Sequence, residues 1–488
     1  MNNYRRLFMK NTKKVLSGVL AMAMVASLAA CSDDNNNDAV VTTTTAATVE
    51  VNTAGFSEEE MAIITSILDE LPDTELENKT VKWLGNYHHY PDGLGASKSI
   101  ALELFEQKYD GVIEEYYIED FQQLSQKLSD YLMSDEGIDF FVFDESNLPA
   151  GISSGKFVPV DDYVDWTLPA WQYVKQGMEM FEFGGKHFMF VTGLESRVQC
   201  WYNKKTIEDN GYDDPWELWE AGNWNWDTFK EMLIDFSDPD NDMIGLDNWF
   251  YSAALYMSCG VTGVSSKDGH LVNNLKDPTL AKAMDFGYEL YQNGCIIDWN
   301  KYEWTTQLQK MGDGSELFDI TGYWQFTMAP ELWEARIDPE YLDVVPVPSP
   351  AGSETFAQAT PTGFQLCKGT RNPEGVALYS LCNIAAAMDK DAEAISDRQA
   401  RDDYGWTQDT IDHLKVVHEN ARLHPVYEIA SGVSSQVAGY VTADSNQGVR
   451  APFAGYPWSE QLDTIFIPVD TLVSEADAAL QEALADLQ

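Results

Sequence analysis

Short apolar runs alternate with helical patterns in the first third of the chain. The runs TVKWLG (80–85), VIEEYYI (112–118) and IDFFVF (138–143) predict strands. Apolar residues at helical spacing predict helices over about 97–108 and 121–133. Strands that alternate with helices and are themselves almost continuously apolar indicate a mostly parallel sheet covered on both faces. The expected fold class is therefore α/β.

Helix ends are marked at two further places. Ser57 and Glu60 form the pattern of a capping box, which predicts a short accessory helix in the segment 57–79, ahead of the main fold. Asn225 precedes another apolar-periodic stretch and can cap its free backbone N–H groups. The tryptophans on either side of Asn225 are expected to pack in the core. A terminal helix is expected over about 474–487.

The front of the chain predicts export. Residues 1–30 begin with five basic and no acidic side chains in the first fourteen positions, and an apolar run over 15–28 follows, as in a signal peptide. That run is short for a permanent membrane anchor, which needs roughly 20 apolar residues. The stretch LAAC, which ends at Cys31, resembles the lipobox of bacterial lipoproteins. A plain secretory signal with a chance cysteine is the alternative.

The lipobox resemblance implies that Cys31 carries the lipid that holds the protein on the outer face of the cytoplasmic membrane. Residues 31–56 are polar and poor in large side chains, which predicts a flexible tether. Two acyl chains bind a membrane far more durably than one. The only expected membrane contact is therefore this anchor.

Composition limits the partners. Removing residues 1–30 leaves 458 of 488 residues with 26 basic and 79 acidic side chains, a net charge of −53. Nucleic acid and anionic lipid surfaces are poor partners for such a field. A chain of this length predicts two or three domain-sized units.

No metal or cofactor is expected. Five cysteines besides Cys31 lack metal-binding spacing, which predicts buried free thiols: Cys200, Cys259, Cys295, Cys367 and Cys382. Asp238, Asp240 and Asp242 alternate like the start of a calcium loop. However, Met243 stands where such a loop needs glycine, so a solvated turn is the preferred interpretation.

From residue 80 to the end, the order of segments resembles the family 1 extracellular solute-binding proteins. These are the sugar-binding receptors of ATP-driven (ABC) importers, and they include the maltose-binding proteins. The strongest element is Tyr202-Asn203-Lys204 followed by WNWDTF (224–229). The other segments, in chain order, are KFVPVDDYVD, GGKHFMFVTGLESRVQCWYNKKTIEDNG, DDPWELWEAGNWNWDTFKEM, DPDNDMIGL, TGYWQF, VVPVPSP and GFQLCKGTRNPE.

The resemblance implies a two-lobe, periplasmic-binding-protein-like fold of type II. In this fold each lobe is discontinuous in sequence, crossing strands join the lobes, and the solute binds between them. The implied lobes are 80–192 plus 360–387 and 193–359 plus 388–488. The implied crossings lie near 192–198, 356–363 and 385–390.

Ligands of open α/β sheets bind beyond the carboxyl ends of the strands. This rule selects Tyr87 and His88 after the first strand, and Asp144 and Glu145 after the third. A neutral sugar needs flat aromatic rings together with polar groups that converge from the rim.

Further ligand candidates come from the resemblance. Trp324, with Tyr323 beside it, matches a stacking position at a strand end. Trp458 and Trp249 each open a helix, and all these rings could equally pack in the core. The polar candidates are Glu195 and Arg197 in a crossing segment, which could equally form an internal hinge pair, and Arg450.

The leading hypothesis is a monomeric, non-enzymatic receptor that captures a carbohydrate, expected to be an oligosaccharide, and delivers it to the permease subunits of an ABC importer. A secreted carbohydrate-active enzyme is one alternative. Glycoside hydrolysis needs two carboxylates about 5 to 10 Å apart, and no local motif marks such a pair. The acidic composition also leaves open a cationic solute, either a polyamine or a peptide.

Overall fold

The computed structural model describes residues 56–90, 98–120, 123–303, 305–307, 309–326, 337–443 and 447–487. The expected signal peptide, Cys31 and the tether up to residue 55 lie outside these residues. The chain forms two compact units: unit 1 comprises Met1–Val142 and Gly369–Asp389, and unit 2 comprises Phe143–Lys368 and Lys390–Gln488. The lobe boundaries near 192 and 360 stay a prediction.

The sheet of unit 1 is parallel, as predicted. Strand β1 (Thr80–Gly85) lies between β2 (Val112–Tyr117) and β3 (Phe140–Val142). Trp83 and Leu84 of β1 are completely buried. The continuous apolar run therefore forms a strand that is covered on both faces.

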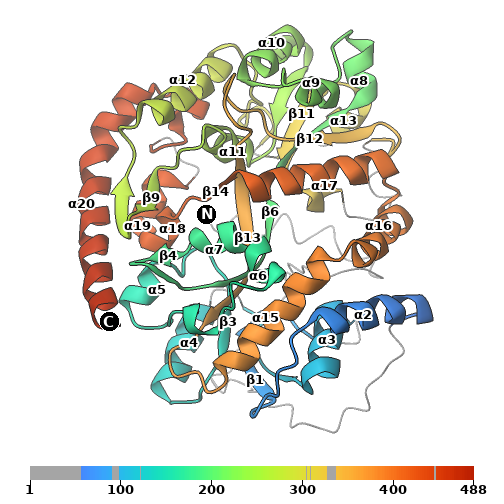
Figure 1. The fold of residues 1–488 in the computed structure, drawn as a ribbon. Helices are drawn as coiled ribbons and strands as arrows, with labels where there is room; N and C mark the ends of the chain where they lie inside the picture. Colours follow the sequence, from blue (N-terminus) through green and yellow to red (C-terminus); the bar gives the residue numbers. More distant parts are fainter. Residues whose placement is uncertain are drawn as a thin grey trace, which may run out of the picture. The chain divides into compact units, whose positions relative to one another are not determined.

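Helices α2 (Glu58–Glu70), α3 (Ile100–Tyr109), α4 (Leu124–Met133) and α15 (Pro373–Met388) complete unit 1. The predicted capping box of α2 is confirmed, because Ser57 accepts from the Glu60 N–H and Glu60 accepts from the Ser57 N–H. Helices α2 and α15 both pack on α3 (Figure 1).

The late segment 369–389 joins unit 1 through Asp139. The buried carboxylate of Asp139 accepts from the backbone N–H groups of Arg371 and Asn372 at 2.7 and 2.9 Å. The Asn372 amide then donates to the Thr80 carbonyl at 2.8 Å, and its oxygen caps α15. These bonds fix the start of α15 beside β1.

Unit 2 contains a four-stranded sheet in the order β12 (Leu342–Val345), β7 (Gln199–Asn203), β11 (Glu316–Thr321) and β8 (Ile244–Asp247). Strands β8 and β11 are parallel, and the other pairs are antiparallel. Every residue of these four strands is buried.

A second set of strands in unit 2 consists of β6 (Phe190–Ser196), β13 (Ala357–Leu366) and β14 (Pro425–Val426). Strand β6 is antiparallel to β13, and β14 is parallel to β13. Burial alternates over residues 192–196 of β6 and along the first half of β13, so one face of this pair, here called the open face, is only half-buried.

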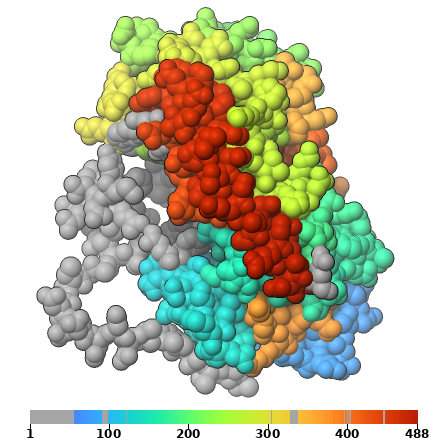
Figure 2. Space-filling model, turned by 90° about the vertical axis from the view of Figure 1, so that its left-hand side faces the viewer, coloured from blue at the N-terminus to red at the C-terminus, as the bar shows by residue number. Residues whose placement is uncertain are grey.

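Two helices of unit 2 test the sequence predictions. Asn225 caps α10 (Trp226–Phe236) through the Asp227 and Thr228 N–H groups, as predicted. The predicted terminal helix is only part of α20 (Trp458–Ala485), which continues through Pro468. Figure 2 shows α20 as a red ridge on the surface, where it packs beside the β10 strand.

The remaining elements of unit 2 are short, apart from three longer helices. They are α5 (Ala150–Ser153), η2 (Asp161–Tyr163), α6 (Pro169–Tyr173), α7 (Lys175–Glu179), β4 (Glu182–Phe183), β5 (Lys186–His187), α8 (Lys204–Asp209), α9 (Pro215–Glu220), η3 (Pro239–Asn241), α11 (Tyr251–Met257), β9 (Val264–Lys267), β10 (His270–Asn273), α12 (Pro278–Gln292), α13 (Gln309–Asp313), η4 (Tyr323–Gln325), α16 (Lys390–Tyr404), α17 (Gln408–Leu423), α18 (Ala430–Val433), α19 (Ser435–Val441) and η5 (Ala451–Ala454).

The prediction of buried free thiols is confirmed for Cys200, Cys259, Cys295, Cys367 and Cys382. Across the described residues, no helix combines the length and the apolar content that crossing a bilayer requires.

Candidate functional site

The adjacent parallel strands β8 and β11 of unit 2 are each followed by a short turn and then by aromatic residues. Strand β8 ends at Asp247, and Asn248 then leads to Trp249. Strand β11 ends at Thr321, and Gly322 leads to Tyr323 and Trp324 in η4. Because the two strands are parallel neighbours, both turns leave the sheet at the same edge, where α/β sheets bind ligands.

The rings at this edge form two contacting pairs. Trp249 stacks on Trp299, with ring centroids 4.1 Å apart and planes 19° apart. Trp324 meets Phe250 edge to face, with centroids 5.8 Å apart. Trp324 remains 44% exposed, so much of its ring surface is open to solvent.

Gly322 is required for the placement of Trp324. A Cβ atom at Gly322 would lie 2.0 Å from the Trp324 ring, closer than side-chain carbons approach one another. Only glycine lets the indole lie over the end of β11. The Gly322-Tyr323-Trp324 sequence is therefore a local device that places an exposed ring at the sheet edge.

Polar side chains occupy the open face of the β6–β13 pair. Glu195 lies opposite Thr360 in the register, and Arg197 follows two residues after Glu195, so the three side chains share this face. Burial raises the pKa of the Tyr323 phenol, and the nearby Glu195 charge raises it further. The ring of Tyr323 also meets His418 edge to face at 5.8 Å. Tyr323 thus links the aromatic edge to the polar face.

Burial lowers the pKa of His418, while the Glu195 carboxylate opposes that shift. The Nδ1 atom of His418 accepts from the Ser196 backbone N–H at 3.1 Å. This bond requires an unprotonated Nδ1, so a neutral ring suits both the burial and the hydrogen bond.

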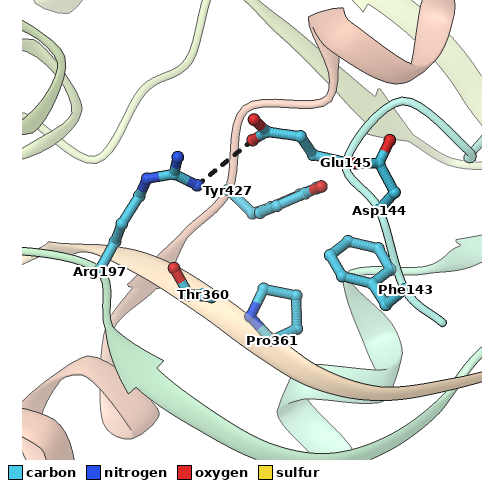
Figure 3. Close-up of a pocket in the computed structure, with 7 residues that line it drawn as sticks. All are labelled: Phe143, Asp144, Glu145, Arg197, Thr360, Pro361 and Tyr427. Carbon is cyan, nitrogen blue, oxygen red and sulfur yellow. Dashed lines mark hydrogen bonds and ion pairs between the residues drawn. The ribbon is translucent and has the colours of Figure 1, made fainter. Parts of the chain in front are cut away.

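A pocket of about 190 Å³ lies beside this polar face. Figure 3 shows Arg197 and Glu145 pointing toward each other, with a guanidinium nitrogen 3.4 Å from a carboxylate oxygen. Burial raises the pKa of the Tyr427 phenol, and the Glu145 charge adds to the shift. The lining residues are Phe143, Asp144, Glu145, Arg197, Thr360, Pro361 and Tyr427.

Three of the residues predicted from the sequence thus meet in one pocket: Asp144, Glu145 and Arg197. Asp144 also accepts from the Ser146 backbone N–H at 2.8 Å, which fixes the turn after β3. Glu195 and Arg197 share a face, but the ion pair is formed by Glu145 and Arg197. The hinge pair considered from the sequence is therefore replaced by a pair between two segments of unit 2.

Two other predicted residues have structural roles. The Trp458 ring is only 4% exposed at the start of α20, so in this structure it has almost no surface to offer a solute. The guanidinium of Arg450 donates to Ser252 Oγ at 2.7 Å, to the Thr442 carbonyl at 3.0 Å and to the Trp249 carbonyl at 2.9 Å. Arg450 thus supports the Trp249 backbone.

Tyr87 and His88 belong to unit 1 and follow β1. The Tyr87 carbonyl accepts from the Trp83 indole N–H at 3.2 Å. His88 stacks on Tyr117 with centroids 4.1 Å apart, and its Nδ1 lies 2.7 Å from a Glu115 carboxylate oxygen. Their contact with a solute stays a prediction.

The residues near the site that were not selected from the sequence include Thr360, Pro361, His418, Tyr427 and Trp299. The sequence offered one indication of the position of Trp299. It follows the apolar residues Cys295, Ile296 and Ile297, which lie beside β8 in the structure. His418 and Tyr427 come from segments more than 200 residues from β6 along the chain, so only the folded structure brings them to it.

The turn that resembled a calcium loop is held by protein cations and amides. Asp242 forms ion pairs with Lys301 at 2.5 Å and Lys310 at 3.3 Å, and these contacts hold its pKa well below the usual range. Asp238 accepts from Asn241. Within the described ranges, no group of three or more His, Cys, Asp or Glu side chains is arranged to hold a metal ion.

The chain belongs to the bacterial extracellular solute-binding protein family, whose model matches residues 101–403. An extracellular solute-binding protein of Staphylococcus aureus, solved in complex with maltose, is 12% identical; the match covers 84% of this chain and 99% of that one, with a TM-score of 0.55. An uncharacterized protein of Listeria monocytogenes is 13% identical and covers 81% and 100% of the two chains, with a TM-score of 0.58. The comparison with curated proteins found no match.

These comparisons establish the class of the protein. The expected two-lobe α/β fold is confirmed, and the chain is a solute-binding protein of the bacterial extracellular type.

Proposed function

We propose that this protein captures a neutral carbohydrate outside the cell and delivers it, unaltered, to the permease of an ABC importer. The observation that carries the proposal is the group of aromatic rings at the carboxyl ends of β8 and β11. Trp324 is substantially exposed there, and the stacked Trp249–Trp299 pair lies at the end of the neighbouring strand.

A sugar ring matches this chemistry. Its C–H faces pack on flat aromatic rings, while its hydroxyls donate to carboxylates and accept from guanidinium groups. The pocket supplies Asp144 and Glu145 as acceptors and Arg197 as donor. Among the described residues, Glu145 is the one hydrogen-bond partner of the Arg197 side chain, so other guanidinium N–H groups remain for hydroxyls.

The size of the solute follows from the number of rings. Two separate ring pairs offer more flat surface than one hexose needs, which favours an oligosaccharide. Micromolar affinity corresponds to about −8 kcal/mol, which a few stacked rings and hydrogen bonds supply after the costs of binding. The maltose complex of the S. aureus protein with this fold supports the same solute class.

Delivery requires a form that the permease distinguishes. In the proposed account, the lobes 80–192 plus 360–387 and 193–359 plus 388–488 close on the solute. A ligand shifts such an equilibrium only through contacts that differ between the two forms. The lipid on Cys31 and the tether after it keep the receptor near the permease.

The proposal includes no catalysis. Hydrolysis needs two carboxylates placed on either side of one glycosidic bond. In the pocket, Glu145 is paired with Arg197, and Asp144 is its sequence neighbour. Incubation with maltodextrins should therefore return the glycans intact; products that disappear on Glu145→Gln substitution would instead establish an enzyme.

Tryptophan fluorescence gives the direct test of capture. A titration with maltodextrins should shift the emission of the wild-type protein and leave that of Trp324→Ala much less changed. A cationic solute is the competing outcome, because the pocket holds two carboxylates and one guanidinium. A shift produced by a polyamine, and by no glycan, would replace the carbohydrate assignment.

A further inference from the structure

Asp247 ends the strand that leads to Trp249, two residues before this tryptophan. It is the last residue of β8 and is completely buried. One oxygen of its carboxylate accepts from the Asn248 N–H at 2.5 Å, and the other accepts from the Gln307 N–H at 2.6 Å. A single side chain therefore holds the backbone on both sides of the ring pair.

The first bond controls the approach to Trp249. Asn248 has φ of +85°, in the left-handed region that few residues other than glycine adopt. Its side-chain oxygen accepts from the Trp249 N–H at 2.8 Å. Asp247 and Asn248 together turn the chain sharply so that the Trp249 ring leaves β8 at a fixed angle.

The second bond controls the loop that carries Trp299. That loop begins where Ile297 donates to the Leu246 carbonyl at 3.0 Å, and it returns to β8 where Gln307 donates to Asp247. At its tip, Tyr302 donates to Asp242 at 2.8 Å. The Tyr302 attachment uses the exposed carboxylate of Asp242, whereas the Gln307 attachment uses the buried carboxylate of Asp247.

Other acids surround this carboxylate. Asp319 of β11 lies opposite Asp247 in the register, and Glu316 of the same strand is also completely buried. Burial raises the pKa of Asp319 and of Glu316, and the Asp247 charge raises both further. Lys310 opposes the shift of Glu316, whereas Asp313 adds to it.

Burial likewise raises the pKa of Asp247, to about 6, against the effect of its two backbone hydrogen bonds. Asp247 is thus the acid of this group whose pKa is raised to near neutral pH.

We propose that Asp247 is a positioning residue for solute capture: its ionised carboxylate holds the Trp249 and Trp299 rings together, and its protonation loosens the Gln307 attachment. An ionised carboxylate accepts from both N–H groups, whereas a protonated one gives up part of its acceptor capacity to its own O–H. The stack is therefore firm at neutral pH and loosens in acid. The expected loss of affinity for the solute in acid rests on the proposed function. The loosening of the Trp249–Trp299 stack in acid does not.

Close tryptophan pairs give an exciton couplet in the far-ultraviolet circular dichroism spectrum. Trp216–Trp219 at 5.0 Å and Trp201–Trp406 at 6.1 Å contribute as well as Trp249–Trp299. The difference spectrum between a protein and the same protein carrying Trp299→Phe therefore isolates the Trp249–Trp299 couplet without a ligand. In the wild-type protein, the couplet should fall by about half or more between about pH 8 and about pH 5, with a midpoint near 6. Trp299→Phe should remove this pair's part of the couplet, and Trp324→Phe should leave that part intact.

In Asp247→Asn the pH step should disappear, while the exposed-acid control Asp240→Asn should retain it. A couplet that ignores pH, or a step that persists in Asp247→Asn, would overturn the proposal. If Asp247→Asn does not fold, hydrogen exchange of the Gln307 backbone N–H in the wild-type protein decides between the outcomes. After correction for the intrinsic exchange rate, the protection of this N–H should drop in acid. Protection that stays constant with pH would refute the role of Asp247.

Solute binding separates this inference from the proposed function. Maltodextrin affinity should fall by about tenfold from about pH 8 to about pH 5 in the wild type and by less than about twofold in Asp247→Asn. A titrating couplet without glycan binding at any pH would refute the carbohydrate assignment and leave the positioning role standing. Glycan binding with a couplet that does not change with pH would support the carbohydrate assignment and refute the positioning role of Asp247.

Discussion

The guanidinium of Arg197 and the carboxylate of Glu145 face each other across the pocket of unit 2 at 3.4 Å (Figure 3). Both side chains keep a third or more of their surface exposed. An ion pair with this exposure contributes little to folding, typically below about 1 kcal/mol. Its position beside Asp144 and Tyr427 fits a role in binding better than one in stability.

Replacement of Arg197 by methionine should therefore weaken glycan binding without unfolding the protein. The loss of a charged hydrogen-bond donor lowers affinity by about tenfold, and the free energy of unfolding should change by less than about 1 kcal/mol. Calorimetry and urea unfolding measure the two effects. Arg371→Met is the matched control, because Arg371 pairs with Asp135 of unit 1 at the same 3.4 Å. Equal affinities for wild type and Arg197→Met would remove Arg197 from the site.

Replacement of Trp324 by alanine should separate binding from folding in the same way. The exposed ring is expected to contribute about 1 to 2 kcal/mol to binding, so affinity should fall by about five- to thirtyfold. The melting temperature should hardly change. Trp219→Ala removes a half-buried ring of α9 and serves as the control, which should keep the affinity of the wild type. Full affinity in Trp324→Ala would contradict the stacking role of Trp324.

The stability of the protein should fall as the pH rises from about 5 to about 7. The buried carboxyl of Glu428 accepts from the Gly263, Val264 and Ala430 N–H groups and from the Tyr256 hydroxyl. Burial raises its pKa from 4.5 to about 7 in spite of these bonds.

The folded state therefore holds the Glu428 proton more tightly than the unfolded state does. The stabilisation is complete below the unfolded pKa and is lost as the pH rises through the folded pKa, by about 3 kcal/mol in all. Urea unfolding at several pH values measures this loss, and Glu428→Gln should reduce it. A stability that instead increases over this range would show that Glu428 remains ionised in the fold.

Membrane attachment is predicted to depend on Cys31. In cells, Cys31→Ser should release the protein from the membrane fraction and abolish labelling by a radioactive fatty acid, because no thiol is left to acylate. Folding should be unaffected, since the substitution lies ahead of the described residues. Persistent membrane association of Cys31→Ser would point to an uncleaved signal anchor.

Local signals in the sequence were sufficient for the elements that local chemistry determines. The apolar run 80–85 is β1, and Asn225 caps α10 through the N–H groups that its position predicts. The strand-end rule selected Asp144 and Glu145, which do line a pocket. Each of these inferences needed only the periodicity of a segment and the identity of its first or last residue.

The contacts of side chains could not be predicted in the same way. Trp458 and Trp324 both follow a glycine-containing turn in the sequence, yet one ring is buried and the other is exposed. The difference depends on what lies above each ring, and this is set by distant parts of the chain. Arg450 illustrates the same point, because its guanidinium donates to acceptors in two segments far from each other in sequence, 249–252 and Thr442.

Isothermal titration calorimetry of the purified protein against neutral maltodextrins, polyamines and short peptides tests the central claim most directly. The account predicts saturable heat from a neutral glycan, with affinity near micromolar or about −8 kcal/mol, and a large loss of that heat in Trp324→Ala. Saturable heat from a polyamine or a peptide, with none from any glycan, would contradict it.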